Sequence, residues 1–423
     1  MTDHTEEPVP GGAGSGPAGL ELGRRALLRL AGVAGVLSTT SLAGARVAFG
    51  APDRHGDVLV VLSLRGGFDG LAAVAPVGDP AWAGLRPNIG TPERAVKRVD
   101  DTFGLHPGLS PLFDAWDDGV LAAVHGVGQP STSRSHAVAT AELERAAADS
   151  VRTGWVDRVA GLGDVGLFAA TQVGNPALPG SAAGPRDELA VGRIANEKLS
   201  VSEDVVPLAA WQRAIGQLHA DARAQVARPT VTALRGVTVL RPLADDAAKD
   251  DGDDEYPDGA LGDALRDVAR LVRAGVGLRV VTVDAGGWDL HAGAGRVDGG
   301  AMRDRLQELA QALAAFRGDL GGDFDRVTVV TVSEFGRRAA ENGSGGTDHG
   351  RGNAALVFGG SVRGGRVYGR WPGLAGDRLA DGDLAVTTDY RSVLAEVLDA
   401  RLGVGPAVFP GFSPARLGLV QAH

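Results

Sequence analysis

Residues 260–286, "ALGDALRDVARLVRAGVGLRVVTVDAG", contain in succession the two patterns that decide the fold. In the first part, apolar side chains recur at helical spacing, which predicts an amphipathic helix over 260–275. The second part, "LRVVTVDAG", is a short apolar run that stops at a glycine. A run of this kind is typical of a strand that is buried on both faces of a parallel sheet.

The same alternation continues on both sides of this stretch. A second helical pattern covers 301–320, and further strand-like runs are found at 57–70, 119–128, 326–336 and 353–360. Strands that alternate with helices of this length imply right-handed crossovers. The sequence therefore predicts an α/β fold with a largely parallel central sheet and helices on both faces.

We expect residues 51–423 to form a single α/β domain with an irregular insertion at about 150–260. Within the insertion, "GLFAATQVG" (166–174) predicts a strand, and the amphipathic stretch 203–226 predicts a covering helix. The acidic run "DDAAKDDGDDEYPDG" (245–259) does not fit the ligand spacing of an EF-hand, which favours a solvated loop.

Composition narrows the possible functions. The chain has 423 residues, a formal net charge of −10 and no dense run of Lys or Arg, which argues against nucleic acid as a partner. It contains no cysteine, so a thiolate nucleophile and a Cys-based metal site are excluded. Any metal ion must therefore be held by histidines and carboxylates.

The first fifty residues have the layout of a twin-arginine export signal. Arg24 and Arg25 precede a short, mildly apolar segment that ends in the small residues "AGA" at 43–45. That segment is shorter than the ~20 residues needed to span a bilayer, so we expect cleavage and no stable membrane span afterwards. The location would be periplasmic, cell-envelope or extracellular. The alternative is a helix that happens to begin with two arginines.

Polar residues gather where the predicted strands end. They are Asp69 after the first strand, Asp284, Asp289 and His291 after another, Ser333 and Glu334 after a third, and Asp348 and His349 before the last. In open α/β sheets, ligands bind at the carboxyl ends of the strands. Each residue alone fits a helix cap or a hydrogen-bonded structural role, but four converging loops favour a metal site. Carboxylates with imidazoles favour zinc or manganese.

The segment "QPSTSRSH" (129–136) offers a second set of candidates. Ser133 and Ser135 are possible nucleophiles, Arg134 is a possible oxyanion partner, and His136 is a possible base or metal ligand. The alternative is a Ser-rich helix cap without chemistry. The chain contains no G-x-S-x-G motif, which disfavours a standard α/β-hydrolase.

Several of these motifs occur together in a known order. They are "VVLSLRGGFDGLAAVAPVGDPAW", "FGLHPGLSPL", "VGQPSTSRSH", "VDAGGWDLHA", "VSEFGRR", "GTDHGRGN", "GGRVYGRWPGL" and "TTDYRSVLAEVL". From residue 57 to residue 413 the chain thus resembles the bacterial exported family known as domain of unknown function 1501, which is grouped with the alkaline phosphatase and sulfatase superfamily.

The resemblance implies an alkaline phosphatase-like fold with up to two divalent ions. Strand order then assigns Asp289, His291 and His349 to one ion. It assigns Asp69, Glu334 and the Ser133/Ser135 region to the other, and it leaves Asp348 as a carboxylate beside His349. Two departures from the superfamily pattern stand out: Phe335 occupies the place of a histidine ligand, and the spacing between Asp289 and His291 is short.

The expected function is that of an exported metal-dependent hydrolase, with zinc or manganese as cofactor (one or two ions) and a phosphate or sulfate ester as substrate. The alternative is a non-catalytic ligand- or partner-binding envelope protein on the same fold, with a degraded metal site.

Overall fold

The structure is a computed structural model that describes residues 56–162, 166–186, 188–196, 224–247 and 255–421. The export signal expected at 1–50 lies outside the described residues. So do most of the helix expected at 203–226 and the centre of the acidic run at 245–259.

A nine-stranded sheet forms the centre of the described part of the chain, in the order β11-β5-β10-β9-β1-β8-β6-β7, with β12 also paired to β5. All pairs are parallel except the two that β10 makes, with β5 and with β9. The predicted α/β fold with a largely parallel sheet is therefore confirmed. The strands are β1 (Val58–Leu64), β5 (Leu121–Gly128), β6 (Ala170–Val173), β7 (Leu189–Val191), β8 (Val280–Ala285), β9 (Val327–Val332), β10 (Asn353–Gly359), β11 (Val367–Tyr368) and β12 (Thr388–Asp389).

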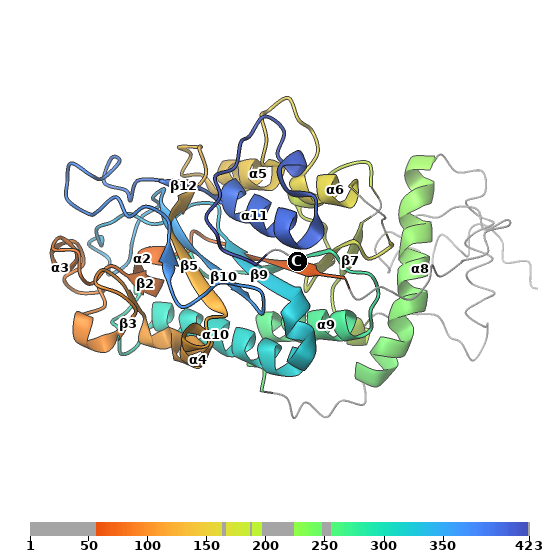
Figure 1. The fold of residues 1–423 in the computed structure, drawn as a ribbon, viewed down its shortest axis with the longest axis horizontal. Helices are drawn as coiled ribbons and strands as arrows, with labels where there is room; N and C mark the ends of the chain where they lie inside the picture. The colour runs from red at the N-terminus through yellow and green to blue at the C-terminus, as the bar shows by residue number, and fades with distance from the viewer. Residues whose placement is uncertain (1–55, 163–165, 187, 197–223, 248–254, 422–423) are drawn as a thin grey trace, which may run out of the picture.

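Helices cover both faces of this sheet (Figure 1). One face carries α4 (Phe113–Asp117), α9 (Ala260–Arg273) and α10 (Ala301–Leu320). The other carries α5 (His136–Arg145), α6 (Trp155–Ala160) and α11 (Tyr390–Leu402). The longest helix, α8 (Ala224–Ala247), lies beside the β7 edge (Figure 1).

Smaller elements complete the described chain. They are α2 (Gly70–Ala73), α3 (Trp82–Leu85), the three-stranded sheet of β2 (Val74–Ala75), β4 (Gly104–Leu105) and β3 (Lys97–Arg98), and the 3₁₀ helices η1 (Glu93–Ala95), η2 (Pro107–Leu112), η3 (Gly180–Ala182), η4 (Ile194–Asn196), η5 (Gly321–Arg326) and η6 (Gly405–Val408).

Strand β1 shows why its sequence is a continuous apolar run. Val60 and Leu62 belong to the core on the α9/α10 side, and Leu59 and Val61 belong to the core on the α11 side. Successive side chains of a strand point to opposite faces, and both faces of β1 are covered, so every position except Ser63 is apolar. All seven residues of β1 are buried.

Strand β10 differs from its expected direction. It follows β9 through the loop 333–352, in which the structure has no crossover helix. A parallel neighbour needs such a crossover, and without one the chain returns antiparallel. As a result, the start of β10 lies at the edge of the sheet where β9 ends, which brings the loop before β10 to that edge.

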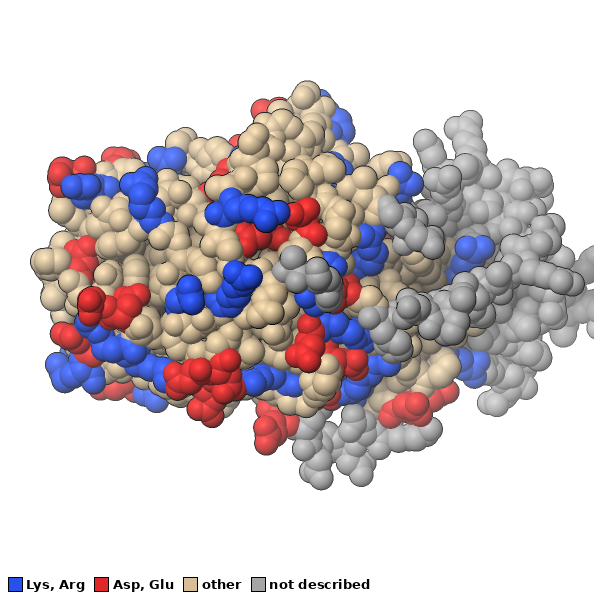
Figure 2. Space-filling view, viewed as in Figure 1, with Lys and Arg blue, Asp and Glu red and all other residues tan. Residues whose placement is uncertain are grey.

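Lysine and arginine side chains are interspersed with aspartate and glutamate on the face drawn in Figure 2, without a large area of one sign. Among the described residues, no helix is both long and apolar enough to cross a membrane.

Candidate metal centre

The candidate site lies at the edge of the sheet where the parallel strands end. Strands β1, β8 and β9 are parallel neighbours and end at this edge. β5 ends there too, because β5 and β9 both run antiparallel to β10. The loops that follow these four strands therefore meet the loop that precedes β10, as the strand-end rule predicted.

Three histidines surround the carboxylate of Asp289. His349 Nε2 lies 3.0 Å and His291 Nε2 lies 3.1 Å from Asp289 Oδ1. His136 Nε2 lies 3.5 Å from the second oxygen, Oδ2. His136, Asp289 and His349 alone already form a group whose ligand atoms all lie within 4.8 Å of one another. We call these four residues, from three separate segments of the chain, the His–Asp cluster.

Each histidine of the cluster has its Nδ1 atom at a hydrogen-bond acceptor. His349 Nδ1 is 2.8 Å from the backbone oxygen of Arg134, which can only accept, so Nδ1 carries the proton. His136 Nδ1 is 2.8 Å from Glu334 Oε1, and His291 Nδ1 is 3.4 Å from Asp348 Oδ1. The neutral His349 ring therefore has its lone pair on Nε2, the atom that faces Asp289. His136 and His291 have a carboxylate oxygen near both ring nitrogens.

This arrangement fits a divalent metal ion. His291 Nε2 and His349 Nε2 are 2.9 Å apart, and two lone pairs at that distance repel unless a cation or a proton lies beside them. Metal–nitrogen bonds of ~2.0–2.1 Å place neighbouring ligand atoms about 2.9–3.4 Å apart. Imidazole nitrogens and a carboxylate are ligands that suit zinc or manganese. The donor set and its spacing thus match a metal site of this kind.

A buried arginine holds Asp289 in place. Arg337 donates to Asp289 Oδ1 at 2.7 Å, and its side chain is only 1% exposed. Its other N–H groups donate to backbone oxygens of Gly66, Gly67, Trp288 and Thr347. Burial alone would raise the pKa of the Asp289 carboxyl, but the hydrogen bond and positive charge of Arg337, aided by the neighbouring histidines, outweigh it and lower that pKa to about 2. Arg337 was not predicted as a site residue, although it follows the buried strand run "RVTVVTV" by only five residues.

Glu334 supports the cluster from behind. Its carboxylate Oε1 accepts from the backbone N–H of Gly66 at 2.9 Å and from His136 Nδ1, and its side chain is 3% exposed. Burial raises the pKa of Glu334, yet hydrogen bonds from backbone N–H groups and from His136 lower it overall. Glu334, a predicted metal ligand, thus orients His136 in this structure, and its Oε1 atom is already engaged by Gly66 and His136.

The structure places Asp69, another predicted ligand, outside the cluster. Its Oδ2 pairs with the buried guanidinium of Arg86 at 2.7 Å, and its Oδ1 caps helix α2 by accepting from Ala72 N. Asp69 is therefore a helix cap, which is the alternative to metal binding that the sequence also allowed.

Asp348 lies on the rim of the site. Its Oδ1 accepts from Asn342 Nδ2 at 3.0 Å and lies 3.4 Å from His291 Nδ1. The hydrogen bond from Asn342, followed by the contact with His291, lowers the pKa of Asp348. In this structure Asp348 thus contacts His291, whereas the sequence placed it as a carboxylate beside His349.

The serine segment lies directly before His136, the first residue of α5. Ser133 Oγ accepts from the backbone N–H of Ser135, whereas the Ser135 side chain makes no capping hydrogen bond to α5. The guanidinium of Arg134, expected as an oxyanion partner, instead forms a 2.6 Å ion pair with Asp383. Only the backbone carbonyl of Arg134 faces the cluster.

Phe335 and Gly67 form the apolar floor of the site. The Phe335 ring lies 4.5 Å from the His349 ring and 4.9 Å from the His136 ring, centroid to centroid. Gly67 has φ +75°, and a Cβ there would lie 2.5 Å from Phe335 Cε2. Phe335 is therefore no ligand but an apolar wall against which the two imidazoles pack.

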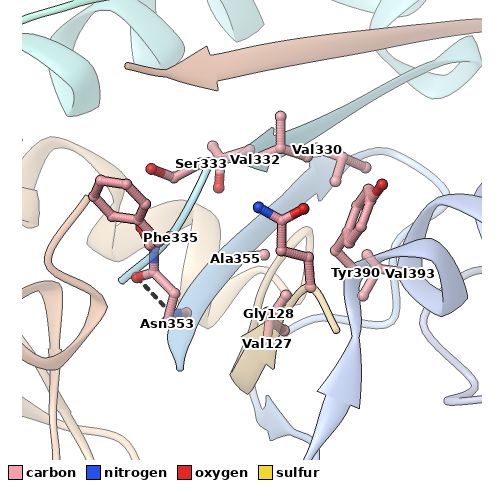
Figure 3. A pocket seen from close by; sticks show the side chains of 13 residues that line it. Val127, Gly128, Val330, Val332, Ser333, Phe335, Asn353, Ala355, Tyr390 and Val393 are labelled. Carbon is pink, nitrogen blue, oxygen red and sulfur yellow. Dashed lines mark hydrogen bonds between the residues drawn. The ribbon is translucent and has the colours of Figure 1, made fainter. Parts of the chain in front are cut away.

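A small pocket lies beside this floor, between the sheet and α11 (Figure 3). Ser333, Phe335 and Asn353 lie on one side of it, where Asn353 donates to the backbone oxygen of Phe335 at 3.0 Å, and Tyr390 and Val393 lie on the other. Its volume of about 20 Å³ holds about one water molecule, so it is too small for a substrate.

Comparison with known sequences assigns the chain to a family. The family described as "Protein of unknown function (DUF1501)" matches residues 182–404, a shorter stretch than the resemblance from 57 to 413. The chain belongs to this family, as predicted. No curated protein matches the chain.

Two solved structures are similar in part. One is the lipoteichoic acid synthase LtaP from Listeria monocytogenes, with 10% identity and a TM-score of 0.33, covering 73% of this chain and 67% of that protein. The other is the PsFucS1 sulfatase from Pseudoalteromonas sp., with 12% identity and a TM-score of 0.32, covering 74% of this chain. The chain spans 64% of that sulfatase.

Proposed function

We propose that this protein is a metal-dependent hydrolase of phosphate or sulfate esters, with its metal site in the His–Asp cluster. The observation that carries the proposal is the 2.9 Å separation of His291 Nε2 and His349 Nε2 beside the carboxylate of Asp289. Histidines held in this way, with each Nδ1 atom at an acceptor, are arranged for a cation at Nε2.

His136, Asp289, His291 and His349 would hold the ion, and zinc or manganese suits these ligands best. When bound, the ion would supply Lewis acidity toward an ester oxygen. We propose one ion per chain, because Asp69 is engaged by Arg86 and α2, and Glu334 by Gly66 and His136.

The attacking group and the anion contacts would come from the start of α5. Ser135 is exposed and leaves its hydroxyl out of the helix cap, and Ser133 lies two residues earlier. The N-terminus of a ten-residue helix favours the negative charge of a phosphoryl or sulfuryl group. Ser135 or Ser133 would then attack the phosphorus or sulfur atom, the bond to the alcohol oxygen would break, and the serine proton would leave with the alcohol. Water would next release phosphate or sulfate and restore the serine, while the Glu334 carboxylate keeps His136 oriented.

Metal analysis of the purified protein tests the first half of this proposal. We expect about one equivalent of zinc or manganese per chain in the wild type, and loss of most of it in His349→Ala. Asp377→Asn is a matched control, because Asp377 is 81% exposed and pairs only with a neighbouring surface arginine. A metal-free wild type would refute the metal site.

An ester screen tests the second half. Aryl sulfates, phosphate monoesters and phosphate diesters would be offered with and without a chelator, and activity should appear with at least one class and disappear on chelation. A protein that binds the metal yet hydrolyses none of them would favour the alternative, a ligand-binding envelope protein with the same site.

We also propose that the protein is exported by the twin-arginine route, from the Arg24-Arg25 pair and the short apolar segment that follows. Residues 1–50 fused to a reporter should direct it out of the cytoplasm. Replacing Arg24 and Arg25 together by lysine should retain the reporter inside, and equal export of both fusions would contradict the assignment.

A further inference from the structure

We propose that Asp383 is a positioning residue for the His–Asp cluster. Through its ion pair with Arg134, it holds the backbone carbonyl of that residue where His349 Nδ1 donates to it. The inference deepens the proposed function and rests on it, since its consequence is the affinity for the metal ion.

Arg134 forms ion pairs with two aspartates, the buried Asp383 and the exposed Asp381. Arg134 reaches Asp383 Oδ2 at 2.6 Å, and the Asp383 side chain is 0% exposed. The same guanidinium nitrogen lies 3.2 Å from Asp381 Oδ2, whose side chain is 83% exposed. Surface ion pairs contribute little, whereas a buried carboxylate strongly disfavours the loss of its partner. Asp383, not Asp381, therefore sets the position of Arg134.

The backbone of Asp383 is hydrogen-bonded to the loop 333–352, which carries His349. Asp383 forms a β-bridge with Arg338, and Ala339 N donates to Gly382 O at 3.2 Å. The neighbouring residue Arg337 forms a β-bridge with His349. Asp383 thus binds the loop of His349 with its backbone and the loop of Arg134 with its side chain.

These contacts connect Asp383 to two histidines of the cluster, His349 and His136. The Arg134 carbonyl accepts from His349 Nδ1 at 2.8 Å, and Arg134 lies two residues before His136. The rings of His136 and His349 are 4.5 Å apart, centroid to centroid. If Arg134 moved, His349 would lose its Nδ1 acceptor, and the spacing of the two ligands would change.

Competition with a chelating dye tests this role through zinc affinity. Asp383→Asn removes the charge with almost no change of shape, and we expect zinc to bind about tenfold more weakly, as is usual when a ligand's hydrogen-bond partner is disturbed. Asp381→Asn is the matched control and should change the affinity less than twofold. Equal affinity of Asp383→Asn and wild type would overturn the proposal.

A second variant covers the case in which Asp383→Asn does not fold. Replacing Arg134 and Asp383 together by leucine removes both charges, so that neither a buried carboxylate nor its partner is left unpaired. The Arg134 carbonyl is still present in this double variant but is no longer fixed by an ion pair. We expect the same weakening of zinc binding, and wild-type affinity would contradict the proposal.

Nuclear magnetic resonance of the metal-free protein, labelled at histidine nitrogen, separates this inference from the proposed function. The wild type and Asp381→Asn should show His349 protonated at Nδ1, and Asp383→Asn should show a mixture of the two tautomers. If the wild type binds no metal, the proposed function fails, yet this readout still decides the role of Asp383. An unchanged His349 tautomer in Asp383→Asn would refute that role.

Discussion

Arg337 and Asp289 form an ion pair in which the arginine is almost fully buried and the aspartate is half exposed, at 2.7 Å. The guanidinium also donates to four backbone oxygens from three different loops. It therefore both anchors the carboxylate of the His–Asp cluster and joins the loops that carry it. A planar group with five N–H donors is suited to this task, and a lysine ammonium is not.

Replacing Arg337 by lysine should therefore cost stability and metal binding together. Lysine leaves several buried carbonyl oxygens without a donor. We expect the free energy of unfolding, measured in urea, to fall by at least about 3 kcal/mol. Arg378→Lys is the control: Arg378 is 65% exposed and lies 3.8 Å from the exposed Asp377, so its replacement should change stability by less than about 1 kcal/mol. Equal stability of the two variants would contradict the anchoring role.

Glu334→Gln should weaken the metal site with little effect on folding. A neutral amide no longer raises the basicity of the His136 ring as the carboxylate does. If its NH₂ group turns to His136 Nδ1, the imidazole proton must also move to Nε2, the ligand atom. Zinc affinity, measured by chelator competition, should fall about 10–100-fold. Glu341→Gln is the control, because Glu341 is a partly exposed residue of the following loop, and it should leave the zinc affinity unchanged. An unchanged affinity in Glu334→Gln would show that the Glu334 side chain is only structural.

Gly67→Ala tests how closely the loops approach each other. The added Cβ would lie 2.5 Å from the Phe335 ring at a backbone φ of +75°, so the floor under His136 and His349 must shift. Strain of this kind costs about 1–3 kcal/mol, and zinc binding should weaken with it. Gly343→Ala is the control, because a Cβ there would meet nothing within 4 Å. Calorimetric melting and metal titration of both variants would show whether only the first is affected.

His125 makes the fold sensitive to acid. Burial lowers the pKa of His125 to about 4, and the hydrogen bond that its Nε2 donates to Val74 O offsets only part of this effect. The unfolded chain takes up this proton near pH 6.5. Stability from this residue is therefore complete above pH 6.5 and falls as the pH drops toward 4, by about 2–3 kcal/mol at pH ~4.5.

His125→Gln keeps a donor for Val74 O but cannot take up a proton. Urea unfolding at pH ~7 and pH ~4.5 should show a smaller loss of stability in this variant than in the wild type. The remaining loss should come in part from His106, whose pKa burial also lowers to about 4. An identical loss in both proteins would contradict the assignment to His125.

The strands and the main helices could be predicted from the sequence because burial on two faces leaves a clear pattern. The helix expected at 301–320 is α10 (Ala301–Leu320). The direction of β10 could not be predicted, since a strand buried on both faces has the same composition whether it runs parallel or antiparallel. Helix α11 was not predicted, although Val393, Leu394, Val397 and Leu398 recur at helical spacing and Asp389 caps the helix by accepting from Arg391 N.

For the site, the strand-end rule placed Asp289, His291 and His349 at one edge of the sheet together with Asp69 and Glu334, and only strand order in the superfamily that the chain resembles grouped the first three. It did not predict that His136 joins them, or that Asp69 pairs with Arg86. The contacts that orient the ligands could not be predicted from the sequence either. The Arg134 carbonyl is a backbone atom that every residue type has, so its role leaves no trace in the sequence.

The position of β10 inside the sheet has a consequence for motion. The loop 333–352 starts from β9 and ends in β10, and β10 lies between β5 and β9 rather than at an edge. Opening this loop would require breaking hydrogen bonds in the middle of the sheet, where local unfolding is most costly. Amide hydrogens at the base of the His349 loop should exchange with solvent as slowly as those of the core strands, a behaviour unusual for a loop of this length.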